Sequence, residues 1–223
     1  MTYSGDVTPG GPSAVRPLPG VVVRKASVSA MDNDVYLLTD PVTGEQLLVD
    51  AADDAPRLLA LVVEGGRDGG SGLARIVTTH RHPDHHRALR ELAAATGART
   101  AAGRDDASHL PVAPDELLDH ADVVRVGSVA LEVVHLRGHT PGSVALLLRA
   151  GDGSTHLFSG DSLFPGGPGR TTRPEDFTSL MDDLEERVFA ALPDDTWVYP
   201  GHGRDTRLGD ERPHLDEWRA RGW

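Results

Sequence analysis

The stretch that decides the fold is T-T-H-R-H-P-D-H-H, residues Thr78 to His86, which follows the apolar run A-R-I-V. In an extended segment, residues two apart project to the same side, so His80 and His82 can bind one ion. The proline that follows them favours the start of a helix. The first turn of this helix would direct Asp84 and His85 towards a second ion. The stretch therefore predicts a metal site at the end of a buried strand.

Three further polar turns follow strand-like runs, and each turn is framed by glycine or proline. They are G-H-T-P-G-S with His139, S-G-D-S with Asp161, and P-G-H-G with His202. Such turns let a short side chain point off the edge of a sheet. Two adjacent cations need a shared carboxylate and further imidazoles, which these turns supply. The chain has no cysteine, and nitrogen and oxygen ligands without sulfur suit zinc, iron or manganese.

These motifs together resemble the metallo-β-lactamase superfamily, whose H-x-H-x-D-H motif stands here at residues 80–85. The resemblance implies an αββα sandwich, in which two mixed β-sheets are flanked by helices and the metals lie at one edge of both sheets. It also implies two sets of metal ligands joined by a bridging aspartate, Asp161. The first set is His80, His82 and His139, and the second set is Asp84, His85 and His202.

Within the superfamily, the turns are most similar to the small glyoxalase II-like (hydroxyacylglutathione hydrolase-like) enzymes, which hydrolyse thioesters of a low-molecular-weight thiol. The resemblance implies a binuclear metal-dependent hydrolase acting on a small-molecule substrate, which we expect to be a thioester. Two cations lower the pKa of a bridging water towards neutrality, which gives a hydroxide nucleophile. We expect Asp84 to orient this hydroxide in addition to binding metal. Zinc is the favoured metal, with iron or manganese as alternatives.

The identity of the substrate stays open because the sequence departs from the glyoxalase II pattern. The usual G-R-T-D reads G-R-T-T at residues 169–172, and Arg81 and Pro83 differ from the aromatic-rich form of the motif. The larger glyoxalase II enzymes carry a C-terminal helical domain that helps bind glutathione, whereas about twenty residues follow His202 here. Neither the acyl group nor the thiol carrier is therefore predicted.

The main alternative is a sulfur (persulfide) dioxygenase of the same superfamily, with one iron bound by the residues at positions His80, His139 and Asp161. A β-lactamase is less favoured, because the known types lack the bridging aspartate or use a cysteine. A protein in which the metals only stabilise the fold is the non-catalytic alternative.

Three more residues are candidates for supporting roles. Arg170 could bind a substrate carboxylate, or could be an exposed structural arginine. Asp50 ends a strand and could hold a metal-ligand histidine from behind, or could simply be a polar strand end. His86 adjoins the motif but lies off its spacing, which favours a supporting or surface position.

Composition limits the remaining classes of function. The net charge of −12 disfavours nucleic acid and anionic membranes as partners. No apolar run approaches the roughly 20 residues needed to span a membrane. Residues 1–20 lack the pattern of a secretory signal, so we expect a cytoplasmic protein. The oligomeric state is not predicted.

The pattern of elements predicts one domain over residues 21–223, preceded by a flexible lead-in over residues 1–20. Each half of this domain shows strands first and helices later, which favours two packed sheets with helices outside. The expected helices cover residues 55–64, 84–96 and 175–191, and a last helix begins near residue 212.

Overall fold

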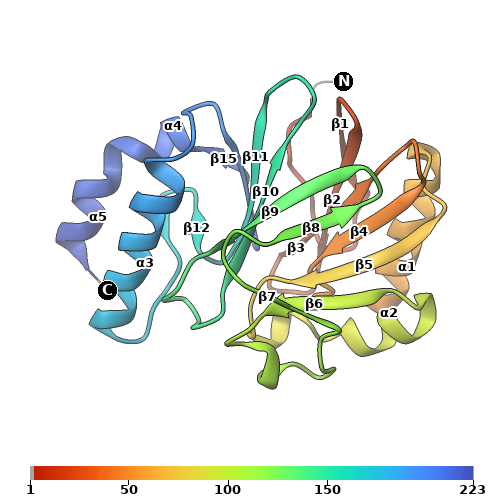
Figure 1. Cartoon of the computed structure of the whole chain (residues 1–223), viewed down its shortest axis with the longest axis horizontal. Helices are drawn as coiled ribbons and strands as arrows, with labels where there is room; N and C mark the ends of the chain where they lie inside the picture. Colours follow the sequence, from red (N-terminus) through yellow and green to blue (C-terminus); the bar gives the residue numbers. More distant parts are fainter. Residues whose placement is uncertain (1–2, 223) are drawn as a thin grey trace.

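A computed structural model describes residues 3–222 as two β-sheets packed face to face, with helices on both outer faces (Figure 1). The first sheet has seven strands in the order β1-β2-β3-β4-β5-β6-β7, and the second has six in the order β15-β14-β11-β10-β9-β8. Each sheet contains both parallel and antiparallel pairs. The predicted αββα sandwich of two mixed sheets is confirmed.

The first sheet is built from the N-terminal half of the chain and is covered by α1 and α2 (Figure 1). Its strands are β1 Ala14–Leu18, β2 Val21–Val28, β3 Asn33–Thr39, β4 Glu45–Val49, β5 Gly72–Thr78, β6 Arg99–Gly103 and β7 Glu116–Leu118. Its helical segments are α1 Ala55–Glu64, η1 Gly65–Asp68, η2 Pro83–His85, α2 Leu89–Thr96 and η3 Ala107–His109.

The second sheet is built from the C-terminal half and is covered by α3, α4 and α5 (Figure 1). Its strands are β8 Val123–Val126, β9 Val129–His135, β10 Val144–Arg149, β11 Thr155–Gly160, β14 Trp197–Pro200 and β15 Thr206–Arg207. A small hairpin is formed by β12 Leu163–Phe164 and β13 Gly167–Pro168. The helical segments are α3 Pro174–Leu184, the π-helical turn η4 Glu185–Phe189, α4 Leu208–Glu211, η5 Arg212–His214 and α5 Leu215–Arg221.

Strand β10 shows why both faces of each sheet are buried. Val144, Leu146 and Leu148 belong to the core between the sheets, whereas Ala145 and Leu147 pack under α3. Alternate side chains of a strand point to opposite faces, so an almost continuous apolar run fills two cores. The arrangement leaves the carboxyl ends of β5, β9, β11 and β14 to carry the polar turns.

The structure corrects three of the predicted boundaries. The helix expected over residues 84–96 is instead the short 3-10 turn η2, followed after a break by α2. The helix expected over residues 175–191 is α3, which continues as the π-helical turn η4. The last helix begins with a 3-10 turn at Arg212 and becomes α-helical at Leu215.

The stretch over residues 1–20, expected to be a flexible lead-in, contains strand β1, which pairs antiparallel with β2. Its sequence A-V-R-P-L gave a weak signal because it holds one proline and no apolar alternation. Proline is tolerated at this position because β1 is an edge strand. Tyr3, further towards the N-terminus, packs against the core between the sheets. Within residues 3–222, no helix has the length and apolar character needed to span a bilayer.

Candidate metal centre

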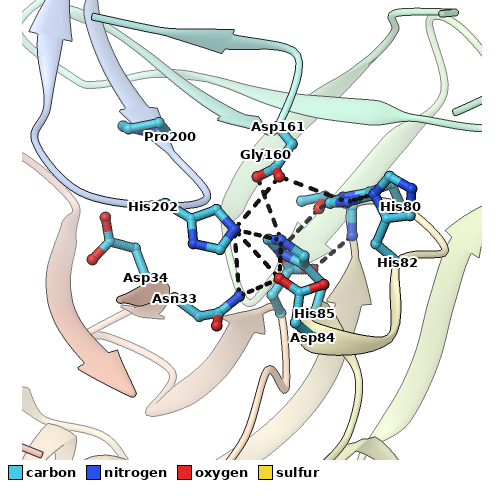
Figure 2. Close-up of polar contacts among 12 residues, drawn as sticks. Asn33, Asp34, His80, His82, Asp84, His85, Gly160, Asp161, Pro200 and His202 are labelled. Atoms are coloured by element: carbon cyan, nitrogen blue, oxygen red, sulfur yellow. Dashed lines mark hydrogen bonds and ion pairs between the residues drawn. The ribbon is translucent and has the colours of Figure 1, made fainter. Parts of the chain in front are cut away.

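The seven residues predicted as metal ligands lie together at one edge of the sandwich. Figure 2 shows six of them converging from turns that belong to both sheets. The turn after β5 carries His80, His82, Asp84 and His85. The other three positions follow β9, β11 and β14, and are His139, Asp161 and His202.

A first group consists of three imidazole nitrogens. The Nε2 of His80 lies 3.1 Å from the Nδ1 of His82, which lies 2.9 Å from the Nε2 of His139. The third side of this triangle, between His139 and His80, measures 3.3 Å. A tetrahedral zinc ion with Zn–N bonds of about 2.0–2.1 Å holds its nitrogen ligands roughly 3.3 Å apart. The triangle therefore has the dimensions of one face of such a site.

A second group lies beside the first and contains a carboxylate. The Nε2 of His85 lies 3.1 Å from the Nε2 of His202. The Oδ2 of Asp84 is 3.5 Å from His85 and 3.4 Å from His202. Two imidazoles and one carboxylate are a donor set suited to zinc, iron or manganese.

Asp161 lies between the two groups and faces both. Its Oδ1 is 3.4 Å from the Nε2 of His85, whereas its Oδ2 is 3.6 Å from His139 and 3.5 Å from His202. The Oδ1 is buried and has no hydrogen-bond partner within the described residues. A buried carboxylate oxygen without a donor is costly unless a cation meets it. The residues present therefore fit a pair of divalent metal ions.

Gly201 allows this close packing around Asp161. A Cβ at this position would lie 2.1 Å from the Oδ1 of Asp161 and 2.7 Å from the Cε1 of His85. Only glycine leaves room for both side chains, so the glycine of the P-G-H-G turn serves the geometry of the site.

The outer ring nitrogens of four histidines are hydrogen bonded to oxygen acceptors at distances of 2.7–3.0 Å. This fixes the proton on Nδ1 and leaves the Nε2 lone pair directed into the cluster. The pairs are His80 with Thr79 Oγ1, His85 with Asp50 Oδ2, His139 with the Arg170 carbonyl, and His202 with the Met31 carbonyl.

Asp50 supports both groups from behind. Its Oδ2 accepts hydrogen bonds from the Nδ1 of His85 at 2.9 Å and from the hydroxyl of Thr79 at 2.8 Å, while its Oδ1 accepts from the Thr79 amide. Thr79 in turn accepts from His80, so one carboxylate orients an imidazole of each group. Of the two interpretations of Asp50 from the sequence, the structure shows the supporting contact.

Two supporting residues were missed in the sequence. Asn33 donates from Nδ2 to the Oδ2 of Asp84 at 2.9 Å. Asp106 accepts hydrogen bonds from the amides of Arg81 and Gly142, both at 3.0 Å, and so joins the turn after β5 to the turn after β9. Asn33 stands at the start of β3, in the segment M-D-N-D-V-Y-L, whose apolar residues indicate a strand but not this contact. Asp106 lies in an ordinary polar turn and gave no signal.

The remaining candidates lie at the margin of the cluster. The side chain of Arg170 is exposed, and it is its backbone carbonyl that contacts His139. His86 is buried and turns away from the cluster, because its Nε2 donates to the Arg81 carbonyl at 3.0 Å. A cleft of about 530 Å³ opens beside His82 and His139, with Arg137 and Thr172 in its wall.

The electrostatics of the two groups differ. Burial lowers the pKa of His80 well below its usual value, and burial also lowers the pKa of His82 and His139. Burial likewise lowers the pKa of His85, but the nearby carboxylates of Asp161 and Asp50 outweigh this and raise it to about 10. The first group thus offers neutral imidazoles, and the carboxylates around His85 favour positive charge at the second.

The fold and the donor cluster define an αββα sandwich with a histidine-rich centre at one edge. Residues 30–202 match the metallo-β-lactamase superfamily, and the chain belongs to it. Membership of this superfamily implies divalent metal ions as cofactors.

The relatives of this chain include hydrolases. It is 39% identical over 173 residues to the hydroxyacylglutathione hydrolase of Fuscovulum blasticum, a match that covers 77% of this chain and 62% of that protein. Among solved structures, ETHE1 from Myxococcus xanthus is 32% identical, with a TM-score of 0.73 over 86% of this chain and 82% of that one. TTHA1623 in a di-iron-bound form is 29% identical, with a TM-score of 0.66 over 83% of this chain and 95% of that one.

Proposed function

We propose that this chain is a binuclear metal-dependent hydrolase of thioesters. The observation that carries the proposal is the convergence of seven donors, with the tautomers of four of the five imidazoles fixed by hydrogen bonds from behind. In this proposal the first metal is bound by His80, His82 and His139, the second is bound by Asp84, His85 and His202, and Asp161 bridges them.

The relatives support this choice of reaction and of metal number. The curated relative is named for the hydrolysis of hydroxyacylglutathione, and TTHA1623 was solved with two irons bound. The chain spans 62% of the length of that relative, so the thioester substrate is part of the proposal. Zinc is the favoured metal because the donors are imidazoles and carboxylates in tetrahedral spacing.

Bound at these positions, two divalent cations would lower the pKa of a water molecule and polarise a carbonyl group. The role of the protein side chains is to hold and orient the reactants. Asp84 remains a carboxylate at neutral pH, because the hydrogen bond from Asn33 and the neighbouring imidazoles outweigh its burial and lower its pKa. Its Oδ2 can therefore accept a hydrogen bond from the attacking water and orient it.

The cleft beside His82 and His139 provides the space for the substrate. A thiolate has an intrinsic pKa near 8.5, so a thioester needs little protonation of its leaving group. This agrees with a cleft whose titratable side chains are arginines, aspartates and the two histidines.

The test is release of free thiol from S-lactoylglutathione by the purified protein, before and after chelation and then after zinc is restored. We expect turnover that disappears on chelation and returns with the metal. An S-lactoyl ester of N-acetylcysteamine, a neutral thiol, tests whether the thiol carrier matters. Full metal content without thiol release from either ester would contradict the proposal.

A sulfur dioxygenase is the second candidate, and a specific contact favours keeping it. His80, His139 and Asp161 also form a set of two imidazoles and one carboxylate, with His139 Nε2 3.6 Å from Asp161 Oδ2. This donor set with open positions is the one that non-haem iron oxygenases use. Oxygen uptake with glutathione persulfide, together with one iron per chain, would favour this candidate over the hydrolase.

A further inference from the structure

Lys25 is a fully buried cation in strand β2, far in sequence from the donor cluster. Its Nζ lies 2.9 Å from the Oδ2 of Asp34, 2.7 Å from the Oδ1 of Asp205 and 2.6 Å from the carbonyl of Gly203. An ammonium group has three N–H donors, and here three oxygens surround it. A buried ammonium group is costly unless its contacts stabilise it. The parts of the chain that these contacts hold in place therefore indicate the role of Lys25.

The contacts of this network lead to the turn that carries His202. Gly203 follows His202 directly and accepts from Lys25. The amide of Asp34 donates to the carbonyl of Gly201 at 2.8 Å, immediately before His202. The hydroxyl of Tyr36 donates to the carbonyl of Pro200 at 2.6 Å. The backbone on both sides of His202 is therefore fixed to β2 and β3, which belong to the other sheet.

The network does not reach the first group of donors. In Figure 2, Asp34 and Pro200 lie on the side of His202 away from His80 and His82. Within residues 3–222, the side-chain hydrogen bonds and ion pairs of Lys25, Asp34 and Asp205 go to one another, to Tyr3, Tyr36 and Trp197, and to the carbonyl of Gly203. The turns of the first group are held instead by Asp50 and Asp106.

We propose that Lys25 is a positioning residue for His202 and thereby controls filling of the second metal position, independently of the first. The inference rests on the proposed binuclear function. Substitution of Lys25 removes the donor to the Gly203 carbonyl and the cation between Asp34 and Asp205. The turn then loosens on the far side of His202 and its imidazole moves, while the three nitrogens of the first group keep their places. The protein then binds one metal tightly and the other weakly.

The experiment compares metal binding by the parent protein and by Lys25→Met. Metal-free protein is titrated with Co²⁺ followed by visible absorption, and bound metal per chain is measured after dialysis. We expect two positions in the parent. We expect Lys25→Met to keep one position with unchanged affinity and to weaken the other at least tenfold.

Arg24→Met is the matched control. Arg24 is the neighbouring residue on β2, is also buried, and forms an ion pair with Asp68 on the opposite face of the strand. The variant Arg24→Met loses a buried ion pair, as Lys25→Met does, but in the described part of the chain Arg24 makes no hydrogen bond or ion pair with the turn of His202. Both metal positions should therefore keep their affinities. Equal weakening of the second position in both variants would overturn the inference, because general destabilisation would then explain it.

A second variant covers the case in which Lys25→Met does not fold. Lys25→Met combined with Asp205→Asn removes the cation together with one buried carboxylate. The remaining Asp34 can stay buried without Lys25 because it can be protonated at neutral pH. Burial raises its pKa to about 8 even though Lys25 lowers it. The same selective loss of the second metal is expected.

Two further titration results would overturn the inference, and they differ from failure of the proposed function. Either variant binding two metals with parental affinities, or losing both equally, would contradict the role of Lys25. If the parent protein binds two metals but does not hydrolyse thioesters, the proposed reaction is contradicted. The role of Lys25 is then still decided by the metal titration of the variants.

Discussion

At the scale of single residues, the centre depends on Asp161, whose carboxylate faces imidazoles of both groups. Its pKa stays well below the usual value even though burial would raise it, because His202 and His85 stabilise the charged form. Without a cation, its Oδ1 is a buried oxygen with no donor in the described part of the chain. The position of Asp161 therefore suits metal binding but lowers the stability of the metal-free protein.

Asp161→Ala should remove bound metal and turnover while the fold largely survives. The change deletes the carboxylate that contacts both groups but leaves the apolar cores of the sandwich untouched. His80→Ala should act in the same way through the first group. Elemental analysis and circular dichroism of the variants check this expectation, and His109→Ala, at an exposed histidine, is the control. A variant with full metal and full turnover would contradict the ligand assignment.

Gly201→Ala tests the packing of the centre with one methyl group. The new Cβ would lie 2.1 Å from the Oδ1 of Asp161, so the carboxylate or the turn must move. We expect at least a tenfold loss of metal affinity with an intact fold. Gly72→Ala is the matched control, because nothing lies within 4 Å of a Cβ there. Equal metal affinities in the two variants would contradict the account of Gly201.

At the scale of elements, the site depends on turns that follow the carboxyl ends of β5, β9, β11 and β14. These were the turns that the sequence made recognisable, because each breaks an apolar run with glycine or proline. The segment after β5 is not the predicted helix but a 3-10 turn followed by a break at residues 86–88. The proposed metal ligands in this turn face the edge of the sheets, and the regular helix α2 begins only beyond them.

Asp106 joins two of these turns, and its removal should affect both stability and the first metal. Asp106→Ala leaves the amides of Arg81 and Gly142 without their acceptor, and both are in the turns of His80, His82 and His139. We expect a loss of about 1–3 kcal/mol in the free energy of unfolding, as for other buried donors left unpaired. We also expect weaker binding of the first metal.

Urea unfolding and metal titration check this prediction, with Asp105→Ala as control because Asp105 is exposed. Unchanged stability in Asp106→Ala would show that the two turns hold their places without this carboxylate.

Other elements could not be predicted because their signal is not local. Strands β6, β7, β12, β13 and β15 have two to five residues each, too few to show a period. Asn33 and Asp106 reach the site through contacts across 51 and 36 residues of sequence, respectively. Motif spacing revealed the residues that face the cluster, whereas those behind it are visible only in the folded chain.

At the scale of the whole molecule, one apolar core lies between the two sheets, and each sheet packs against its helices around a further core. The charge network of Lys25 and the supporting carboxylates lie in these otherwise apolar layers. Stability should therefore depend on pH through buried groups away from the metal centre.

His156 is such a group, buried in β11 with its Nδ1 3.1 Å from the hydroxyl of Tyr199. Burial lowers its pKa to about 4 from an ordinary value of 6.5. As pH falls, the unfolded chain binds the proton first, so stability is complete above about pH 6.5 and is lost as pH falls through about 4. His156→Asn should lose part of this dependence.

Urea unfolding of metal-free protein at about pH 7.5 and about pH 5 measures the effect. The fall in the free energy of unfolding between these values should be smaller in His156→Asn than in the parent, and His109→Asn should match the parent. An equal fall in all three proteins would contradict a buried neutral His156.

The central claim, a binuclear centre built by seven residues from two sheets, is tested most directly by the elemental metal content per chain of protein purified without added metal. The account predicts about two divalent ions per chain, with zinc in the larger share. A single iron per chain, with no second ion taken up on titration, would contradict the binuclear centre and would favour the dioxygenase.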